Sequence, residues 1–178
     1  MKYNNPNLSV CAIFATDLDG GMGHQGRMPW PRLSDDLKNF RRLTLGGYVL
    51  MGSKTWTSAD MKAPLPLRHN IVWSRDHSRL PNITDQVLQF TGDPAVCLEN
   101  FGVQQPTASR IWVIGGAETL QTWMPRVNTV WHTQIDRRWH CDTGYPHSCW
   151  QSEFVADITE GYRDGATGID YTITVWNR

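Results

Sequence analysis

GMGHQGRMPWPRLSDDLKNFRRL, residues 21–43, joins a glycine-rich loop to a predicted helix, and the rest of the chain is organised around this stretch. Ser34 favours the N-cap position of a helix, and the two aspartates that follow it suit the positive end of the helix dipole. Apolar residues then recur at helical spacing, which predicts a face that packs inward. They are Leu33, Leu37, Phe40 and Leu43.

Asp36 is the unusual residue of this helix, because it lies beside Leu37 and one turn before Phe40, on the apolar side. A carboxylate against an apolar wall has a raised pKa or requires a hydrogen-bonding partner. Asp36 is therefore a candidate for acid–base chemistry. On this stretch alone, the alternative is that Asp36 only complements the helix dipole.

Composition limits the classes of function. The chain has 178 residues and a formal net charge of zero, which predicts one domain over residues 1–178 and no electrostatic footprint for nucleic acid or an anionic membrane. No apolar run approaches the length of a membrane span, and Met1–Asn7 lacks the apolar core of a signal peptide. We therefore expect a cytoplasmic protein.

The four cysteines show no spacing typical of a disulfide framework. Cys141 and Cys149 lie close to His140 and His147, which suggests zinc, but the spacing does not match the usual paired-ligand motifs. We therefore expect no metal site. Cys11 lies in an apolar run and suits a buried thiol.

Apolar runs that alternate with helix signals indicate an α/β domain with a largely parallel central sheet. Strands are expected at residues 8–16, 48–51, 71–73, 87–90, 111–114 and 129–135. An alternating, antiparallel strand near an edge of the sheet is expected at 171–176. A helix with Asp93 as N-cap and Pro94 at its first position is expected to stop at Gly102, near Phe101. A further helix is expected at 117–124.

Two predicted strands run into glycine and then into a helix. Gly52 precedes Ser53-Lys54-Thr55, and Gly115-Gly116 precedes the helix at 117–124. Free backbone N–H groups at such a junction favour phosphate, and ligands of parallel sheets bind beyond the carboxyl ends of the strands. The two junctions and the Asp36 helix are therefore expected to line one cleft.

Taken together, these motifs resemble the dihydrofolate reductase family from about Leu8 to Trp176. The matching residues, in the order and spacing of the family, are Gly23, 28–30, Asp36 with Leu37 and Phe40, 51–56, 64–66 with Arg68, Ser74-Arg75, 113–117, Thr133 and 142–143. The resemblance implies a three-layer fold, with helices on both faces of a mostly parallel sheet and an antiparallel C-terminal edge strand. It also implies a monomer.

The resemblance implies reduction of 7,8-dihydrofolate to tetrahydrofolate by NADPH, with Asp36 promoting protonation of N5 through water. Thr133 would support Asp36 by a hydrogen bond, and Arg68 would pair with the glutamate α-carboxylate of the substrate. Further substrate contacts are implied for Ile13, Met28, Leu37, Phe40, Leu65 and Ile114. A raised pKa at Asp36 would keep proton transfer accessible near neutral pH.

For NADPH, the resemblance implies a nicotinamide site near Ala15 under a lid at residues 21–28, which includes Met22 and Gly23. Asp142 would hydrogen-bond the backbone near Gly23 and steady the closed lid. The cofactor contacts implied at the glycine junctions are Gly52, Ser53, Lys54, Thr55, Gly115, Gly116, Ala117, Glu118, Thr119 and Leu120. Lys54, Ser74 and Arg75 would hold the adenosine 2′-phosphate, which favours NADPH over NADH.

Some positions depart from the family pattern. Ser53 replaces an Arg that many bacterial members have, Leu67 replaces a Gly and Leu120 replaces a Tyr, while Glu118 places a negative charge beside the phosphates. These departures bear on cofactor affinity more than on the reaction. Two alternatives stay open: a relative that reduces another pterin or a ribosylamino-pyrimidine, and a structural protein that kept the fold.

Overall fold

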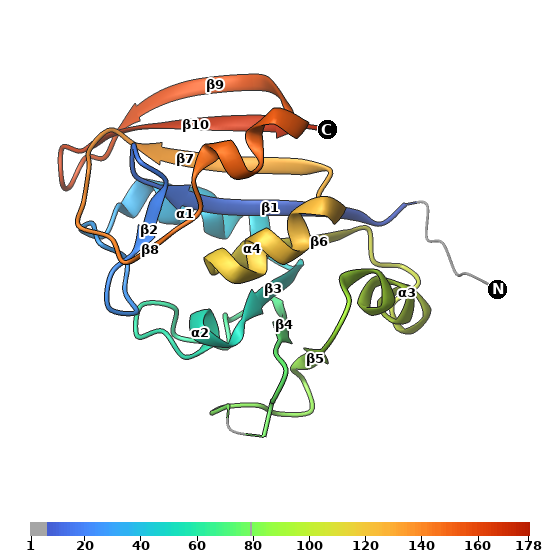
Figure 1. Ribbon diagram of the computed structural model, residues 1–178. Helices are drawn as coiled ribbons and strands as arrows, with labels where there is room; N and C mark the ends of the chain where they lie inside the picture. The colour runs from blue at the N-terminus through green and yellow to red at the C-terminus, as the bar shows by residue number, and fades with distance from the viewer. Residues whose placement is uncertain (1–6, 79) are drawn as a thin grey trace.

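The apolar runs of the sequence form the middle strands of an eight-stranded sheet in the computed structural model, which describes residues 7–78 and 80–178 (Figure 1). In spatial order the strands are β5 (Leu88–Phe90), β4 (His69–Trp73), β3 (Tyr48–Gly52), β6 (Arg110–Gly115), β1 (Ser9–Thr16), β7 (Thr129–Ile135), β10 (Asp170–Asn177) and β9 (Val155–Arg163). Pairs from β5 to β7 are parallel, whereas β10 is antiparallel to both of its neighbours.

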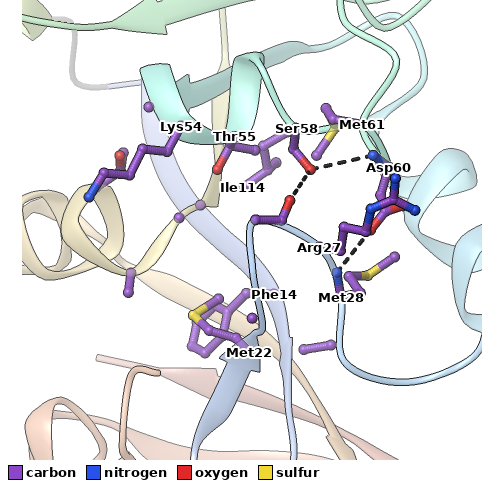
Figure 2. A pocket seen from close by; sticks show the side chains of 18 of the residues that line it. Phe14, Met22, Arg27, Met28, Lys54, Thr55, Ser58, Asp60, Met61 and Ile114 are labelled. Carbon is purple, nitrogen blue, oxygen red and sulfur yellow. Dashed lines mark hydrogen bonds between the residues drawn. The ribbon is translucent and has the colours of Figure 1, made fainter. Parts of the chain in front are cut away.

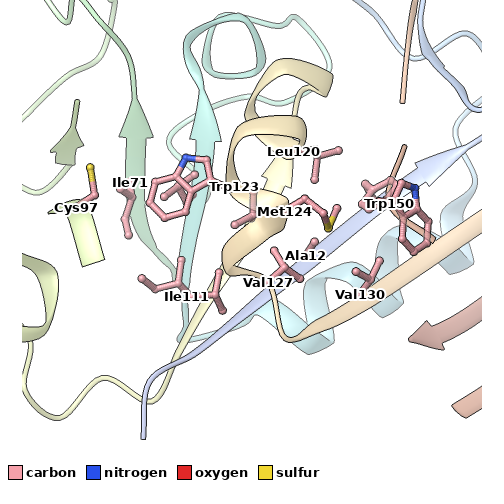
Figure 3. Close-up of a cluster of buried hydrophobic side chains, with 14 of the residues drawn as sticks. Ala12, Ile71, Cys97, Ile111, Leu120, Trp123, Met124, Val127, Val130 and Trp150 are labelled. Carbon is pink, nitrogen blue, oxygen red and sulfur yellow. The ribbon is translucent and has the colours of Figure 1, made fainter. Parts of the chain in front are cut away.

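Helices cover both faces of the sheet, so the expected three layers are confirmed. Along β1, Val10, Ala12 and Phe14 belong to one buried cluster, and Cys11 and Ile13 belong to the other. This alternation follows from the two-residue period of a strand. The first cluster includes side chains of α3 (Pro94–Gln104) and α4 (Ala117–Trp123), and Figure 3 shows the α4 side chains against the strands. The second includes side chains of α1 (Ser34–Thr44) and α2 (Ser53–Trp56).

Short elements that the sequence pattern did not predict complete the fold. β2 (Gly21–Gly23) pairs with β8 (Thr143–Gly144) and joins the lid to the loop after β7. The described residues also form three 3₁₀ helices, which are η1 (Met124–Arg126), η2 (His147–Cys149) and η3 (Gln151–Glu153). In the described part of the chain, no helix has the length and apolar character needed to cross a bilayer.

The prediction that Ser34 caps α1 is wrong. The helix begins at Ser34 itself, the N-cap position is Leu33, and no side chain at that position makes a capping hydrogen bond. Instead, the backbone N–H of Asp35 donates to Oδ1 of Asp164, 3.2 Å away in the turn between β9 and β10. A distant carboxylate thus satisfies a donor that a local cap usually satisfies.

The predicted start of α3 is confirmed and its predicted end is wrong. The Asp93 side chain accepts a hydrogen bond from the N–H of Ala95 at 2.7 Å, but the helix continues through Gly102 to Gln104. Glycine inside a helix costs about 1 kcal/mol relative to alanine. Phe101 and Gly102 are both buried, and packing of this turn outweighs that cost.

The C-terminal strand β10 is antiparallel, as expected, but it is not the edge of the sheet. The edge strand is β9, which pairs with β10 along its whole length and was not predicted. Every residue of β9 is exposed, so neither face of this strand needs to be apolar. Its sequence therefore lacks the regular alternation of apolar and polar residues by which a half-buried strand is recognised.

Candidate active site

A large cleft crosses the carboxyl ends of β1, β3 and β6, where the sequence places the two glycine junctions and the Asp36 helix. Its volume is about 1930 Å³. Pockets for one drug-sized ligand range from roughly 300 to 1,000 Å³, so this cleft has room for two ligands at once. Figure 2 shows the part of the cleft between the lid and the segment after α2.

Asp36 projects from α1 into this cleft, and Oγ1 of Thr133 on β7 donates a hydrogen bond to its Oδ1 at 2.7 Å. Burial raises the pKa of Asp36 above its ordinary value. The Thr133 hydrogen bond opposes that rise, and the negative charge of Asp164 adds to it. The arrangement gives a carboxyl group that holds a proton more readily than an exposed aspartate.

Apolar side chains from two strands, from α1 and from the loop after α2 line the cleft around Asp36. Ile13 lies in the second half of β1, Ile114 lies near the end of β6, and both are largely buried at the cleft. Leu37 and Phe40 extend the wall along α1, and Leu65 faces the cleft from the loop after α2. This wall suits the faces of a flat, largely apolar ring.

Arg68 lies at the outer end of the apolar wall. Its guanidinium carbon is 5.9 Å from the centre of the Phe40 ring, Nε donates to Oγ1 of Thr44 at 3.3 Å, and Nη1 donates to the carbonyl of Pro66 at 3.0 Å. Within residues 7–78 and 80–178, no carboxylate oxygen is recorded within 4 Å of this guanidinium. The cation is therefore available to an anionic ligand group.

Asn70 shapes this wall, and sequence reasoning missed it. Its side-chain oxygen accepts from the N–H of Leu65 at 2.8 Å, and its Nδ2 donates to the carbonyls of Leu65 and Arg68 at 3.0 and 3.1 Å. A buried asparagine that satisfies three backbone groups fixes the loop that carries both residues. Its position at the start of a strand gave no signal of this role.

The lid lies between β1 and α1 and is held on one side by the loop after β7. Oδ2 of Asp142 accepts a hydrogen bond from the N–H of Gln25 at 2.7 Å, and the N–H of Asp142 donates to the carbonyl of Gly23 at 3.0 Å. This is the contact expected from Asp142. The Nδ1 atom of His24 is 3.7 Å from the same carboxylate.

The lid is also held on its other side, by two residues that sequence reasoning missed. The hydroxyl of Ser58 donates to the carbonyl of Gly26 at 3.0 Å, and Oδ2 of Asp60 accepts from the N–H of Met28 at 2.9 Å (Figure 2). Both belong to the segment between α2 and Pro64. We call this pair of contacts the lid clasp.

Asp17 fixes the base of the lid and was not singled out either. Its carboxylate is almost fully buried and accepts hydrogen bonds from the N–H groups of Asp19, Gly21 and Trp139 at 2.9, 2.7 and 3.0 Å. These donors belong to the end of β1, the start of the lid and the loop after β7. One side chain therefore joins the three segments.

The two glycine junctions lie side by side, because β3 and β6 are parallel neighbours and Met51 is opposite Gly115. A Cβ atom on Gly52 would come within 2.2 Å of Oγ1 of Thr119 on α4, so this close approach requires glycine. A Cβ on Gly116 would lie 3.3 Å from Oγ1 of Thr55. The bare backbones form one continuous floor to the cleft.

Nearly all of the expected site residues line this cleft. Besides those described above, they are Ala15, Met22, Gly23, Met28, Ser53, Lys54, Ser74, Arg75, Ala117 and Glu118. Lys54 and Arg75 are exposed, and Nζ of Lys54 lies 4.0 Å from the Glu118 carboxylate. The negative charge of Glu118 thus has a cation beside it at the mouth of the cleft.

Leu120 is not at the cleft. Its side chain has no exposed area and, like Trp123, belongs to the buried cluster that α4 shares with β1 and β6 (Figure 3). The expectation that it contacts the cofactor is therefore wrong for its side chain. Thr119, the preceding residue of α4, lines the cleft, whereas the Leu120 side chain projects about 100° farther round the helix, into the core.

The family model described as dihydrofolate reductase matches residues 9–178, which include every strand and helix of the structure. The chain belongs to the dihydrofolate reductase family. It is an oxidoreductase of folate metabolism with dihydrofolate reductase activity, and NADPH is the cofactor of this family.

The sequence identity to individual members of the family is modest. The chain is 34% identical over 134 residues to the dihydrofolate reductase of Mycobacterium leprae. This match covers 71% of this chain and 72% of that one. It is 44% identical over 70 residues to the bifunctional dihydrofolate reductase-thymidylate synthase of Paramecium tetraurelia; this covers 39% of this chain and 15% of that longer protein. A structure of the Enterococcus faecalis dihydrofolate reductase, complexed with NADP(H) and RAB-propyl, superposes with a TM-score of 0.77 at 22% identity and covers 96% of both chains.

In the described part of the chain, no group of three or more His, Cys, Asp or Glu side chains is arranged to hold a metal ion. In the His140–Cys149 segment, the His147 ring packs against His132 of β7, with ring centres 4.8 Å apart, and both rings lie beside Trp150.

Proposed function

We propose that Asp36 is the acid of the reaction, promoting protonation of N5 of 7,8-dihydrofolate through water while NADPH supplies hydride to form tetrahydrofolate. The observation that carries this proposal is the setting of Asp36, which combines an apolar wall with the 2.7 Å hydrogen bond from Thr133. General acids work best with a pKa near the working pH, and burial moves the pKa of Asp36 in that direction.

The substrate lies along the apolar wall in this proposal. Asp36 bonds the amidine-like edge of the pterin, and the backbone carbonyls of Ile13 and Ile114 meet the ring from the two strands. Leu37, Phe40 and Leu65 pack against the rings. Arg68 has no recorded carboxylate partner among the described residues, and it pairs with the glutamate α-carboxylate at the outer end.

The residues at the glycine junctions fit a dinucleotide. Their backbones are bare enough for close approach, and Thr55 and Thr119 place hydroxyl groups on the same floor. Lys54, Ser74 and Arg75 lie farther out on the cleft wall and bind the 2′-phosphate in this proposal. Ala15 on β1 faces the nicotinamide, between the pterin wall and the lid.

The lid excludes water from the reacting groups when it is closed. Asp142 holds it on one side and the lid clasp holds it on the other, so that Met22 and Met28 close the cleft above β1. A dry site strengthens the hydrogen bond between Asp36 and the substrate. Asp36 then keeps its proton in place until transfer.

The test is loss of NADPH absorbance with 7,8-dihydrofolate, measured for the wild type and for Asp36→Asn over a range of pH. The variant is expected to fold and to lose about 100-fold or more of its turnover at pH 7, since an amide cannot relay a proton. Part of that turnover returns at low pH, where the substrate itself is protonated. Asp35→Asn, which changes the adjacent carboxylate, is the matched control and stays within about threefold of the wild type. Full turnover in Asp36→Asn contradicts the assignment.

A further inference from the structure

Asp164, in the turn between β9 and β10, is a fully buried carboxylate that the proposed reaction does not use. Its Oδ2 accepts hydrogen bonds from the N–H of Ala166 at 3.2 Å, and from the N–H and hydroxyl of Thr167, both at 2.9 Å. Its Oδ1 is left for the N–H of Asp35, 3.2 Å away. The side chain therefore joins its own turn to a helix that is far away in the sequence.

That helix is α1, and the bond is made at its first turn. Because Leu33 provides no side-chain cap, Asp164 takes the place of the missing N-cap. A second hydrogen bond runs in the opposite direction, because the N–H of Gly165 donates to Oδ2 of Asp35 at 3.4 Å. The turn thus holds the start of the helix at the residue directly before Asp36.

The charge of Asp164 also acts on Asp36, whose pKa it helps to raise. Among the described residues, no Lys, Arg or His nitrogen is recorded within 4 Å of Asp164. Burial raises the pKa of Asp164, but its hydrogen bonds outweigh burial and bring the pKa below its ordinary value, so this carboxylate is ionised near neutral pH. A negative charge close to a second carboxyl favours the protonated form of that carboxyl.

Other groups near Asp36 do not supply such a charge. Asp35 pairs with Nζ of Lys38 at 2.8 Å, which compensates its charge. Tyr171 on β10 is buried, and burial, followed by the charges of Asp36, Asp35 and Asp164, raises its pKa to about 12, so the phenol is neutral. Thr133 on β7 donates a hydrogen bond and does not titrate. Asp164 is the charge that remains.

We propose that Asp164 is a positioning residue for the reaction, which seats the first turn of α1 and keeps a negative charge close to Asp36. The proposal rests on the assignment of Asp36 as the acid. Asp164 touches neither ligand in this arrangement and does not line the cleft. Its two effects are separable, because the hydrogen bond needs only an acceptor and the charge needs a carboxylate.

The test compares the pH dependence of turnover in Asp164→Asn and the wild type. Asparagine keeps one oxygen for the N–H of Asp35, loses the acceptor that serves Ala166 and Thr167, and removes the charge, so Asp36 is expected to lose its proton at lower pH. Turnover at pH 7.5 falls about two- to fivefold, the decline of the rate with pH begins at lower pH, and the two proteins converge in acid. The Michaelis constant for NADPH is unchanged. Asp157→Asn, which changes an exposed carboxylate on the preceding strand β9, is the control and leaves the profile unchanged.

A profile for Asp164→Asn that superposes on the wild type overturns the inference, provided that Asp36→Asn has lost turnover. Full turnover in Asp36→Asn is a separate result, which overturns the proposed function instead. If Asp164→Asn does not fold, Thr167→Val serves as the second variant, because it keeps the charge and removes one bond that holds the Asp164 carboxylate. It is expected to lower kcat severalfold at every pH without moving the profile, and an unchanged kcat overturns the positioning role.

Discussion

At the scale of single residues, the cleft combines a carboxyl group that has a hydrogen-bond donor with arginines that have no recorded carboxylate partner among the described residues. Asp36 has one hydrogen-bond donor in Thr133 and an apolar wall, a setting that stabilises a protonated carboxyl group. Arg68 and Arg75, in contrast, have no recorded carboxylate partner among the described residues. The two arginines lie on the cleft wall and suit the two anionic groups expected there, a carboxylate and a phosphate.

Arg75 provides the first prediction at this scale. Arg75→Ala is expected to raise the Michaelis constant for NADPH about tenfold and that for NADH little, because only NADPH has the 2′-phosphate. Steady-state kinetics with both cofactors measure the difference. Arg126→Ala, an exposed arginine outside the cleft, is the control. Equal effects on the two cofactors remove Arg75 from the phosphate site.

At the scale of elements, the lid is the part most dependent on contacts between distant segments. β2 pairs with β8, Asp142 holds Gln25, and the clasp of Ser58 and Asp60 reaches the far side of the lid. Asp142 belongs to a recognisable motif, whereas the clasp lies in an irregular stretch without one. The positions on the cleft that sequence reasoning missed are therefore those whose role depends on which loop lies opposite.

The clasp predicts a change in cofactor release. Asp60→Ala removes the acceptor for the N–H of Met28, and a hydrogen bond to a charged group at an exposed site contributes about 1 kcal/mol. NADPH is expected to dissociate about fivefold faster, measured by stopped-flow displacement. Asp60→Asn keeps an acceptor and shows a smaller change. An unchanged dissociation rate in Asp60→Ala means that the clasp does not hold the lid over the cofactor.

At the scale of the whole molecule, two buried clusters on opposite faces of the sheet hold the cleft's strands in register. The α4 helix contributes to both the core and the site, since Thr119 lines the cleft while Leu120 and Trp123 are buried. Packing therefore constrains Leu120 and Trp123, and the ligand constrains Thr119. We expect a substitution at a packed position to change stability and one at the cleft to change ligand binding.

Leu120→Ala tests that division. Removing a fully buried leucine side chain is expected to lower the free energy of unfolding by about 2–5 kcal/mol, while the Michaelis constant for NADPH stays within about twofold. Chemical denaturation and steady-state kinetics give the two quantities. Val103→Ala, whose side chain is 62% exposed on α3, is the control and changes stability by less than about 0.5 kcal/mol. A large rise in the Michaelis constant without loss of stability contradicts the placement of Leu120 in the core.

The sequence by itself determined the central strands, the helix start at Asp93, the two glycine junctions and the setting of Asp36. Each depends on local information: a continuous apolar run, a capping residue, a bare backbone, or a carboxylate on an apolar helix face. The order of these motifs along the chain was also enough to indicate the family that the comparisons establish.

Only the tertiary structure decided the cap of α1, the edge strand β9, the passage of α3 through Gly102, the place of Leu120 and the clasp on the lid. In each case the deciding contact joins residues far apart in the chain, or a buried surface outweighs a local preference of about 1 kcal/mol. Local patterns specify which groups need a partner. The fold determines which distant residue provides it, as Asp164 does for the N–H of Asp35.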